Sequence, residues 1–207
     1  MKYDAWEKLA HRYNNQWVQK YSLGPTRREV KKYVLPLLEK NNELKILDIG
    51  CGTGQLIKEI GEHYSAVRYL GIDVAKNMID IARRSNNGER IEFKNVSVDD
   101  FVCEEKFDII ICTHAFPYFP NKNEAMNKIS SLCQKGGKVI IVSSSTNNLK
   151  DLIINMYVKI WTSKARYLSI AQMKSLFSSA GFAVKNVDVI RERAYMPTIA
   201  LLYAEKE

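Results

Sequence analysis

The sequence contains few cysteines, and none of them lies in a metal-binding or disulfide-type pattern. The four cysteines stand singly at positions 51, 103, 112 and 133. Without a Cys-x-x-Cys pair they predict no zinc or other metal site. They fit the reduced thiols of a cytoplasmic protein.

Long apolar segments are also missing. No run approaches the ~20 apolar residues that a membrane-spanning helix needs. The first six residues, MKYDAW, contain no apolar core of a signal peptide. These absences predict a cytoplasmic protein without a membrane span.

Acidic residues are in the minority, with 23 Asp and Glu against 31 Lys and Arg, which gives a formal charge of +8. Such a charge could attract nucleic acid. The basic residues are scattered, however, and form neither a stripe nor an RNA-binding motif, so they favour a solubilising surface over a nucleic-acid partner. The oligomeric state has no signature in the sequence.

Glycine is sparse as well, yet three of the ten glycines occupy alternate positions, Gly50, Gly52 and Gly54. An apolar β-type run precedes them, and a helical pattern begins at Leu56. Glycine permits a positive φ and lets a ligand approach the main chain closely. A helix N-terminus offers unpaired N–H groups and a positive dipole end. This stretch predicts a site for a nucleotide-type ligand.

The segments around it alternate between strand-like and helix-like patterns. Strands are predicted at 44–49, 67–72, 90–95, 107–112 and 138–143, with helices near 54–63, 75–85 and 122–134 and a short turn or helix at 98–102. This order predicts an α/β fold, a doubly wound and mostly parallel sheet with helices on both faces. Ligands of such sheets bind at the carboxyl ends of the strands.

The flanking regions complete one predicted domain, residues 1–207, with a helical cover over 1–40 and a Rossmann-like core over 41–207. A helix is expected at 3–20, then a break at 23–26, where Thr26 and Glu29 fit a capping box. A helical insert is expected within 146–168, after the fifth strand. Ser169 and Gln172 predict another capping box, and strands at 182–190 and 197–205 predict an antiparallel hairpin.

Asp73 ends the second predicted strand, in Gly71-Ile72-Asp73, 19 residues after Gly54. A carboxylate there can accept both hydroxyls of a ribose. An N-cap of the next helix is the alternative role, and the two are compatible. NAD sites carry the spacing GxGxxG, whereas the spacing here is GxGxG.

Four motifs together resemble the class I S-adenosylmethionine-dependent methyltransferases, over about residues 40–205. They are Ile46–Gly54, Gly71–Asp73, Phe107–Cys112 and Gly136–Ile141. The resemblance implies a seven-stranded sheet whose last strand is antiparallel, and S-adenosyl-L-methionine as the cofactor. The opening Trp6–Tyr13 is similar to that of small-molecule methyltransferases, in which a helix closes over the cofactor.

The resemblance also implies roles for single residues. The loop Gly50, Cys51, Gly52 and Gly54 would lie against the methionine portion, and Asp48 would order the loop and the ligand's ammonium. Asp73 would take the ribose hydroxyls and Val74 would pack on adenine, with Thr113 also at the cofactor. The family's acidic residue after the third strand is Ser97 here, beside Val98, so either Ser97 or Asp99 would accept the adenine amino group.

Methyl transfer needs mainly orientation of the reactants, which can contribute ~7–11 kcal/mol. A base is needed only when the acceptor is protonated. His114, which follows the fourth strand, is the first candidate base because imidazole titrates near neutrality. Its alternative role is to line the cofactor pocket through its backbone. Tyr13 and Tyr118 are further candidates.

The segment after the fourth strand also bears on the methyl acceptor. It lacks the Asn/Asp-Pro-Pro-Tyr/Phe motif of enzymes that methylate nucleic-acid bases. Aromatic residues there and in the later segments predict an apolar pocket for a small molecule: Phe116, Tyr118, Phe119, Tyr157, Trp161, Tyr167 and Tyr195. Two alternatives remain, an RNA-directed methyltransferase and a module that binds the cofactor without catalysis.

Overall fold

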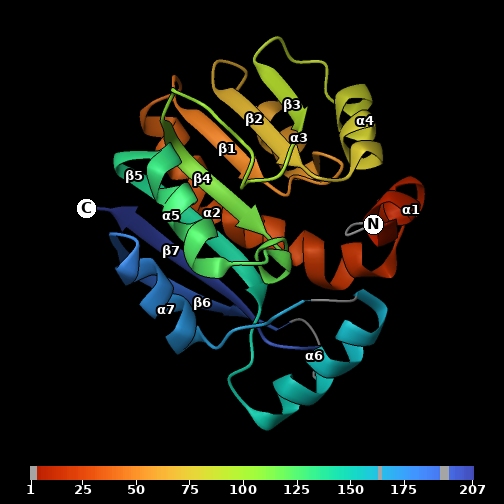
Figure 1. Ribbon diagram of the computed structural model, residues 1–207. Helices are drawn as coiled ribbons and strands as arrows, with labels where there is room; N and C mark the ends of the chain where they lie inside the picture. The colour runs from red at the N-terminus through yellow and green to blue at the C-terminus, as the bar shows by residue number, and fades with distance from the viewer. Residues whose placement is uncertain (1–3, 163–164, 192–195) are drawn as a thin grey trace.

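A computed structural model describes residues 4–162, 165–191 and 196–207, without the side chains of Asp4 and of residues 157–162. Seven strands form one sheet in the order β3-β2-β1-β4-β5-β7-β6 (Figure 1). The strands are β1 (Lys45–Ile49), β2 (Arg68–Asp73), β3 (Ile91–Asn95), β4 (Phe107–Thr113), β5 (Cys133–Ser144), β6 (Phe182–Ile190) and β7 (Ile199–Lys206). Pairing is parallel from β3 through β5, and β7 runs antiparallel to both of its neighbours. The predicted fold class and the closing hairpin are confirmed.

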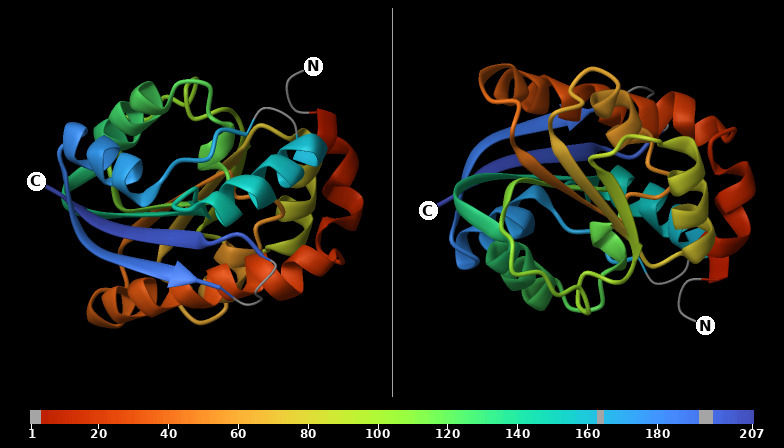
Figure 2. Two further views of the ribbon diagram at one scale, coloured as in Figure 1. Left: turned by 90° about the horizontal axis from the view of Figure 1, so that it is seen from below. Right: turned by 90° about the horizontal axis from the view of Figure 1, so that it is seen from above.

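Helices cover both faces of this sheet (Figure 2). The elements are α1 (Asp4–Tyr13), the π-helix η1 (Gln19–Leu23), α2 (Gly24–Lys40), α3 (Gln55–Gly61), α4 (Lys76–Ser85), the 3-10 turn η2 (Phe116–Tyr118), α5 (Lys122–Leu132), α6 (Leu149–Thr162) and α7 (Ile170–Ser179). Side chains of α2, α3 and α4 pack on one face, and side chains of α5 and α7 pack on the other. Within β4, Ile110 faces the second layer while Ile109 and Ile111 face the first, which explains its continuous apolar run.

The N-terminal segment differs from the prediction. The first helix ends at Tyr13 instead of continuing to residue 20, and η1 runs directly into α2 without a break. The predicted capping box at Thr26 is wrong, because α2 begins after Leu23 without a side-chain cap. The Thr26 hydroxyl instead lies 2.8 Å from His114 Nε2. Glycine and proline at positions 24 and 25 fit the first turn of a helix, where proline's missing N–H costs no hydrogen bond.

The second half follows the predicted order. Helix α6 occupies the insert after β5, and the capping box at the start of α7 is confirmed: Ser169 Oγ accepts from Gln172 N at 3.2 Å, and Gln172 Oε1 accepts from Ser169 N at 2.9 Å. Residues 98–100 form a turn without a helix. Among the described residues, no helix has both the length and the apolar character that crossing a membrane requires.

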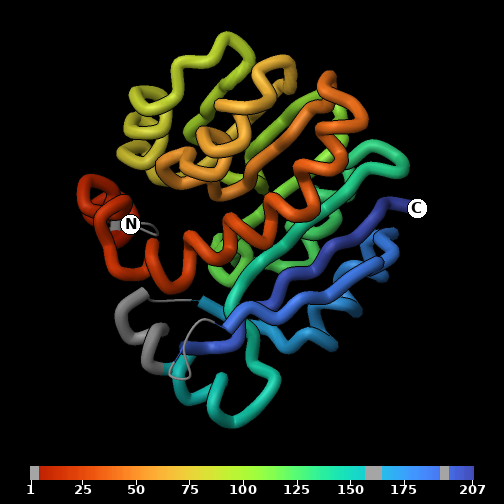
Figure 3. Tube along the Cα trace, turned by 180° about the vertical axis from the view of Figure 1, so that it is seen from behind, coloured from red at the N-terminus to blue at the C-terminus, as the bar shows by residue number. Residues whose placement is uncertain are grey.

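Helix α1 lies apart from the sheet. It packs against α4, and the chain then passes through η1 to reach the long helix α2 (Figure 3). Because β1, β2, β3 and β4 are parallel neighbours, their carboxyl ends, at Ile49, Asp73, Asn95 and Thr113, share one edge of the sheet. The glycine-rich loop is at this edge.

Candidate functional site

The loop after β1 turns sharply through glycines in the left-handed region. The φ angles of Gly50, Gly52 and Gly54 are 73°, 54° and 73°. The N–H groups of Gly50 and Cys51 both donate to Ile72 O, at 2.7 and 3.1 Å. A Cβ at Gly50 would lie 2.2 Å from Ala115 Cβ. The loop therefore depends on glycine for its conformation and for its close contact with the chain after β4.

This loop borders a cleft at the carboxyl ends of the strands. The cleft is open to solvent, and its empty space with the open mouth included is about 810 Å³. Most of the residues singled out from the sequence line it: Tyr13, Gly50, Gly52, Asp73, Val74, Ser97, Val98, Asp99, Thr113, His114 and Tyr118. Gly54 does not, since it precedes α3 and a Cβ there would lie 2.8 Å from Phe93 Cζ.

A second hollow, here called the side recess, adjoins the cleft and shares Tyr13, Gly50, Gly52, Thr113 and His114 with it. Asp48 and Cys51 line the recess. Cys51 is also part of the core cluster that contains residues of β1 and α3.

Asp48 is the most unusual group in the recess. Its side chain is 1% exposed, and Oδ1 has no hydrogen-bond partner within the part of the chain that the structure describes. Burial, and then the negative charge of Asp73, raise its pKa from 3.8 to about 7. A buried acceptor without a donor is costly, so the recess favours a ligand that brings a positively charged donor.

Arg27 is a residue of this site that the sequence analysis missed. It lines the side recess together with Asp48. Its Nε donates to Glu59 Oε1 at 2.7 Å, and its Nη1 donates to Gln19 Oε1 at 3.0 Å. The sequence marked Arg27 only as one of several scattered basic residues, because nothing local shows that α2 brings it to the glycine loop.

Asp73 ties the glycine loop to the end of β2. Its Oδ2 accepts from Gly52 N at 2.9 Å, and its Oδ1 accepts from Ala75 N at 2.8 Å. The pKa of Asp73 is raised, because the effect of burial exceeds that of these two hydrogen bonds, which lower the pKa. A carboxylate offers about four acceptor positions, so two hydroxyl donors can still be accommodated. The N-cap alternative is wrong, since Ala75 is the N-cap of α4 and has no side-chain cap of its own.

Ser97 and Asp99 differ in what they can still accept. Ser97 Oγ donates to Asp100 Oδ2 at 2.7 Å and accepts from Asp100 N at 3.1 Å. Asp99 is exposed and lines the cleft. Val98 is 4% exposed and belongs to the core. Asp99 is therefore the better placed acceptor of the two.

His114 is held in a strained conformation. It is the one non-glycine residue with a positive φ, 59°, in the described part of the chain. Burial, and then the charge of Arg27, lower its pKa from 6.5 to about 4, so the imidazole is neutral at pH 7. For Tyr13, burial and then Asp73 raise the pKa above its ordinary value. A general base must gain a proton, and the surroundings of His114 disfavour the imidazolium ion that would result. A tyrosine must first lose its proton to act as a base, and the surroundings of Tyr13 disfavour the phenolate.

The mouth of the cleft is aromatic. Tyr118, Phe119 and Pro120 line it, and Trp6 of α1 meets Tyr118 edge-on with ring centroids 5.4 Å apart. Phe116, by contrast, is 1% exposed and lies in the core, so its predicted place in the pocket is wrong. The structure does not describe the side chains of Tyr157 and Trp161, and Tyr195 lies outside the described residues, so their predicted places in the pocket stay predictions.

Lys122, the first residue of α5, holds the segment that carries these aromatics. Its Nζ donates to the carbonyl oxygens of Phe116, Pro117 and Phe119, at 3.3, 3.1 and 3.1 Å. Burial, and then Arg166, lower its pKa from 10.5 to about 8. Three carbonyl contacts from one ammonium fix the shape of this wall of the cleft.

Comparison with known proteins places the chain in a family. A family model described as a methyltransferase domain matches residues 40–194. Malonyl-[acyl-carrier protein] O-methyltransferase of Acetivibrio thermocellus is 31% identical over 100 residues, which cover 48% of this chain and 35% of that protein. Ubiquinone biosynthesis O-methyltransferase of Chromobacterium violaceum is 24% identical over 200 residues, which cover 89% of this chain and 83% of that protein.

The chain spans 55% or less of the length of several such relatives. Among solved structures, magnesium protoporphyrin IX methyltransferase from Synechocystis PCC 6803 with bound SAH superposes with a TM-score of 0.77 at 17% identity, covering 100% of this chain and 99% of that one. At that identity the likeness concerns the fold. The chain therefore belongs to the methyltransferase-domain family, with the class I S-adenosylmethionine-dependent methyltransferase fold that its motifs predicted.

Proposed function

We propose that this chain transfers a methyl group from S-adenosyl-L-methionine to a small-molecule acceptor and releases S-adenosylhomocysteine. The observation that carries the proposal is the unpartnered buried oxygen of Asp48 beside the glycine loop. An ammonium group would supply the missing donor and the opposite charge. The cofactor's methionine portion carries such a group, next to a carboxylate that suits Arg27 across the recess.

The other contacts follow from the shape of the cleft. Asp73 would accept the ribose hydroxyls with the acceptor positions that Gly52 and Ala75 leave open. Val74 would pack on the adenine ring, and Asp99 rather than Ser97 would accept from its amino group. The backbones of Gly50, Cys51, Gly52 and Thr113 would line the methionine portion.

When bound, the cofactor supplies an electrophilic methyl group on its sulfonium, so the chain's own residues have mainly to orient and enclose. The pKa of about 4 for His114 supports a role in lining and positioning, through its contact with Thr26, rather than one as general base. Tyr13 and Trp6 of α1 and Tyr118 would exclude water at the cleft mouth. Tyr118 remains a candidate for contact with the acceptor.

An apolar acceptor suits the wall of Tyr118, Phe119 and Pro120. The name of one relative, a ubiquinone biosynthesis O-methyltransferase, also supports a small-molecule acceptor. We place the enzyme in the cytoplasm on the basis of its four free thiols, and we treat residues 1–207 as one methyltransferase domain.

The proposal is tested by calorimetry followed by a methyl-transfer assay. S-adenosylmethionine and S-adenosylhomocysteine should bind, and NAD should not; tight NAD binding without adenosylmethionine binding would refute the proposal. Radiolabelled cofactor and a panel of phenolic, carboxylic and amine acceptors should then yield a labelled small molecule. Binding without transfer to any acceptor would indicate a non-catalytic module, and salt-sensitive labelling of RNA would indicate the RNA-directed alternative.

A further inference from the structure

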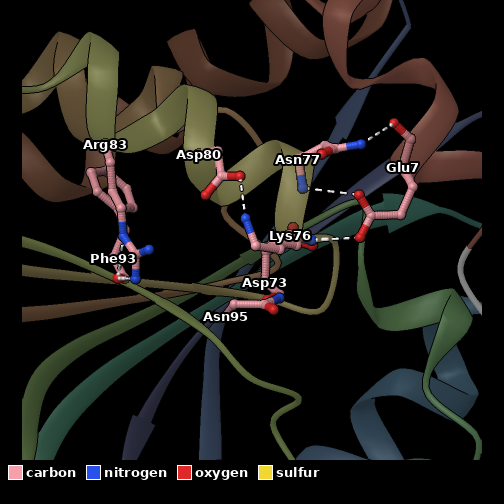
Figure 4. A network of polar contacts seen from close by, with 8 residues as sticks. All are labelled: Glu7, Asp73, Lys76, Asn77, Asp80, Arg83, Phe93 and Asn95. Carbon is pink, nitrogen blue, oxygen red and sulfur yellow. Dashed lines mark hydrogen bonds and ion pairs between the residues drawn. The ribbon is translucent and has the colours of Figure 1, made fainter.

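The first turn of α4 takes its cap from another helix. Ala75 precedes α4 and offers no side-chain cap, and the carboxylate of Asp73 accepts from the N–H of Ala75. The N–H groups of Lys76 and Asn77 would otherwise lack partners. Both donate to Glu7 of α1, to Oε1 at 2.6 Å and to Oε2 at 2.9 Å (Figure 4).

Two further contacts fasten α1 at the same place. Asn77 Nδ2 donates to the main-chain oxygen of Glu7 at 3.1 Å, so the backbone of α1 is held as well as its side chain. Next to this, Ala10 is 2% exposed and packs against Ala75 and Met78. Helix α1 therefore contacts the start of α4 through three hydrogen bonds of Glu7 and through the apolar packing of Ala10.

The carboxylate of Glu7 is in the position where a negative charge is most favourable, at the N-terminus of a helix. The Lys76 ammonium does not compete for it, because that group pairs with Asp80 Oδ2 at 2.6 Å (Figure 4). Removing the Glu7 carboxylate would thus leave two backbone donors of α4 without a partner from the chain.

The same turn is connected to the ligand cleft on two sides. Asp73, which accepts from Ala75, also accepts from Gly52 in the glycine loop. Trp6 and Tyr13, on the helix that carries Glu7, line the cleft. Trp6 and Tyr13 form part of the cleft wall, so a movement of α1 away from α4 would widen the cleft around a bound ligand.

We propose that Glu7 is a positioning residue that latches α1 onto the first turn of α4 and so controls how fast the cofactor and its product leave the cleft. This rests on the proposed function, since it assumes that the cleft holds S-adenosylhomocysteine after the reaction. Release of Glu7 from Lys76 and Asn77 then precedes product release.

The test measures the dissociation rate of S-adenosylhomocysteine in stopped flow. The Trp6 side chain at the cleft mouth reports the release by fluorescence, in a background in which Trp17 and Trp161 are replaced by Phe. Glu7→Ala should accelerate release roughly ten-fold, equivalent to about 1.4 kcal/mol. Glu7→Gln should have a smaller effect, because its carbonyl oxygen can accept one of the two bonds.

Glu29→Gln is the matched control, since its carboxylate pairs with Lys32 within α2 and belongs to neither α1 nor α4. It should leave the release rate unchanged, and single-turnover methyl transfer from preformed complex should be unchanged in all these variants. If Glu7→Ala does not fold, Asn77→Ala removes only the bond to the Glu7 main chain and should still accelerate release about two- to three-fold.

Release at the wild-type rate in the Glu7 variants would overturn the latch, and so would an equal acceleration of release by Glu29→Gln. A lower unfolding midpoint with unaltered release would show that Glu7 is only a structural cap and would overturn it too. If the wild-type chain binds no S-adenosylhomocysteine, it is the proposed function that fails, and this outcome is visible before any variant is made.

Discussion

Replacing Asp48 with Asn should make the unliganded chain more stable and the cofactor complex weaker. Burial and the neighbouring charge of Asp73 hold the pKa of Asp48 at about 7, against an ordinary value of 3.8. The group is 1% exposed, so solvent does not screen this penalty. Asn has nearly the same shape and carries no charge, so the variant removes the cost of the buried carboxylate.

The magnitude follows from the difference between the two pKa values. At about 1.36 kcal/mol for each pH unit, the rise corresponds to a cost of about 4 kcal/mol once Asp48 is ionised. The folded chain binds the proton of Asp48 more tightly than the unfolded chain does. The free energy of unfolding of the wild type therefore falls as the pH rises from about 4 to 7. Asp48→Asn should therefore match the wild type below pH 4 and exceed its free energy of unfolding by up to about 4 kcal/mol at pH 8.

Urea denaturation at several pH values, with and without S-adenosylhomocysteine, would measure this. With the ligand the advantage of the variant at pH 8 should shrink by about 1.5–3 kcal/mol, because loss of a charge-assisted contact with the ammonium weakens binding roughly 10- to 150-fold. A stability difference between the two proteins that does not change with pH would refute the assignment of an unpartnered, raised-pKa carboxyl group at position 48.

Three further predictions concern single side chains. Asp73→Ala should weaken S-adenosylmethionine binding roughly 10-fold or more in calorimetry, and an unchanged affinity would move the ribose contact elsewhere. His114→Asn, chosen because Asn tolerates a positive φ, should leave turnover within a few-fold of wild type; a loss of about 100-fold or more would instead identify His114 as the base. Lys122→Met should raise the KM for the acceptor and leave the cofactor Kd unchanged, because its three carbonyl contacts shape only the Tyr118–Phe119 wall. Above pH 8, where Lys122 loses its proton, wild-type KM should rise in the same way, while a flat KM profile up to pH 9.5 would count against this role.

Much of the fold was predictable because it depends on local patterns. The order of apolar strands and amphipathic helices was enough to predict the sheet and the closing hairpin, and the residue types at positions 169 and 172 were enough to predict the α7 capping box. The glycine loop was predictable for a similar reason, since φ angles of 54° to 73° are a property of the residue type.

The candidate site was predictable only in part. Residues at the carboxyl ends of neighbouring parallel strands, such as Asp73 and Thr113, lie at one edge of the sheet however the helices pack. The choice between Ser97 and Asp99 was not predictable, because it depends on a hydrogen bond from Ser97 to Asp100 that the spacing of residues does not reveal.

The sequence by itself determined the class of fold, the position of the glycine loop and the family of the donor site. Only the tertiary structure decided what Thr26, Arg27 and Glu7 do. Thr26 had every local feature of a helix cap, yet its hydroxyl contacts His114, 88 positions away; Glu7 caps a helix 69 positions away. The periodicity of apolar residues identifies the buried face of a helix but not the element that packs against that face. A polar side chain forms hydrogen bonds with the groups that this packing places next to it, and these can be distant in the sequence.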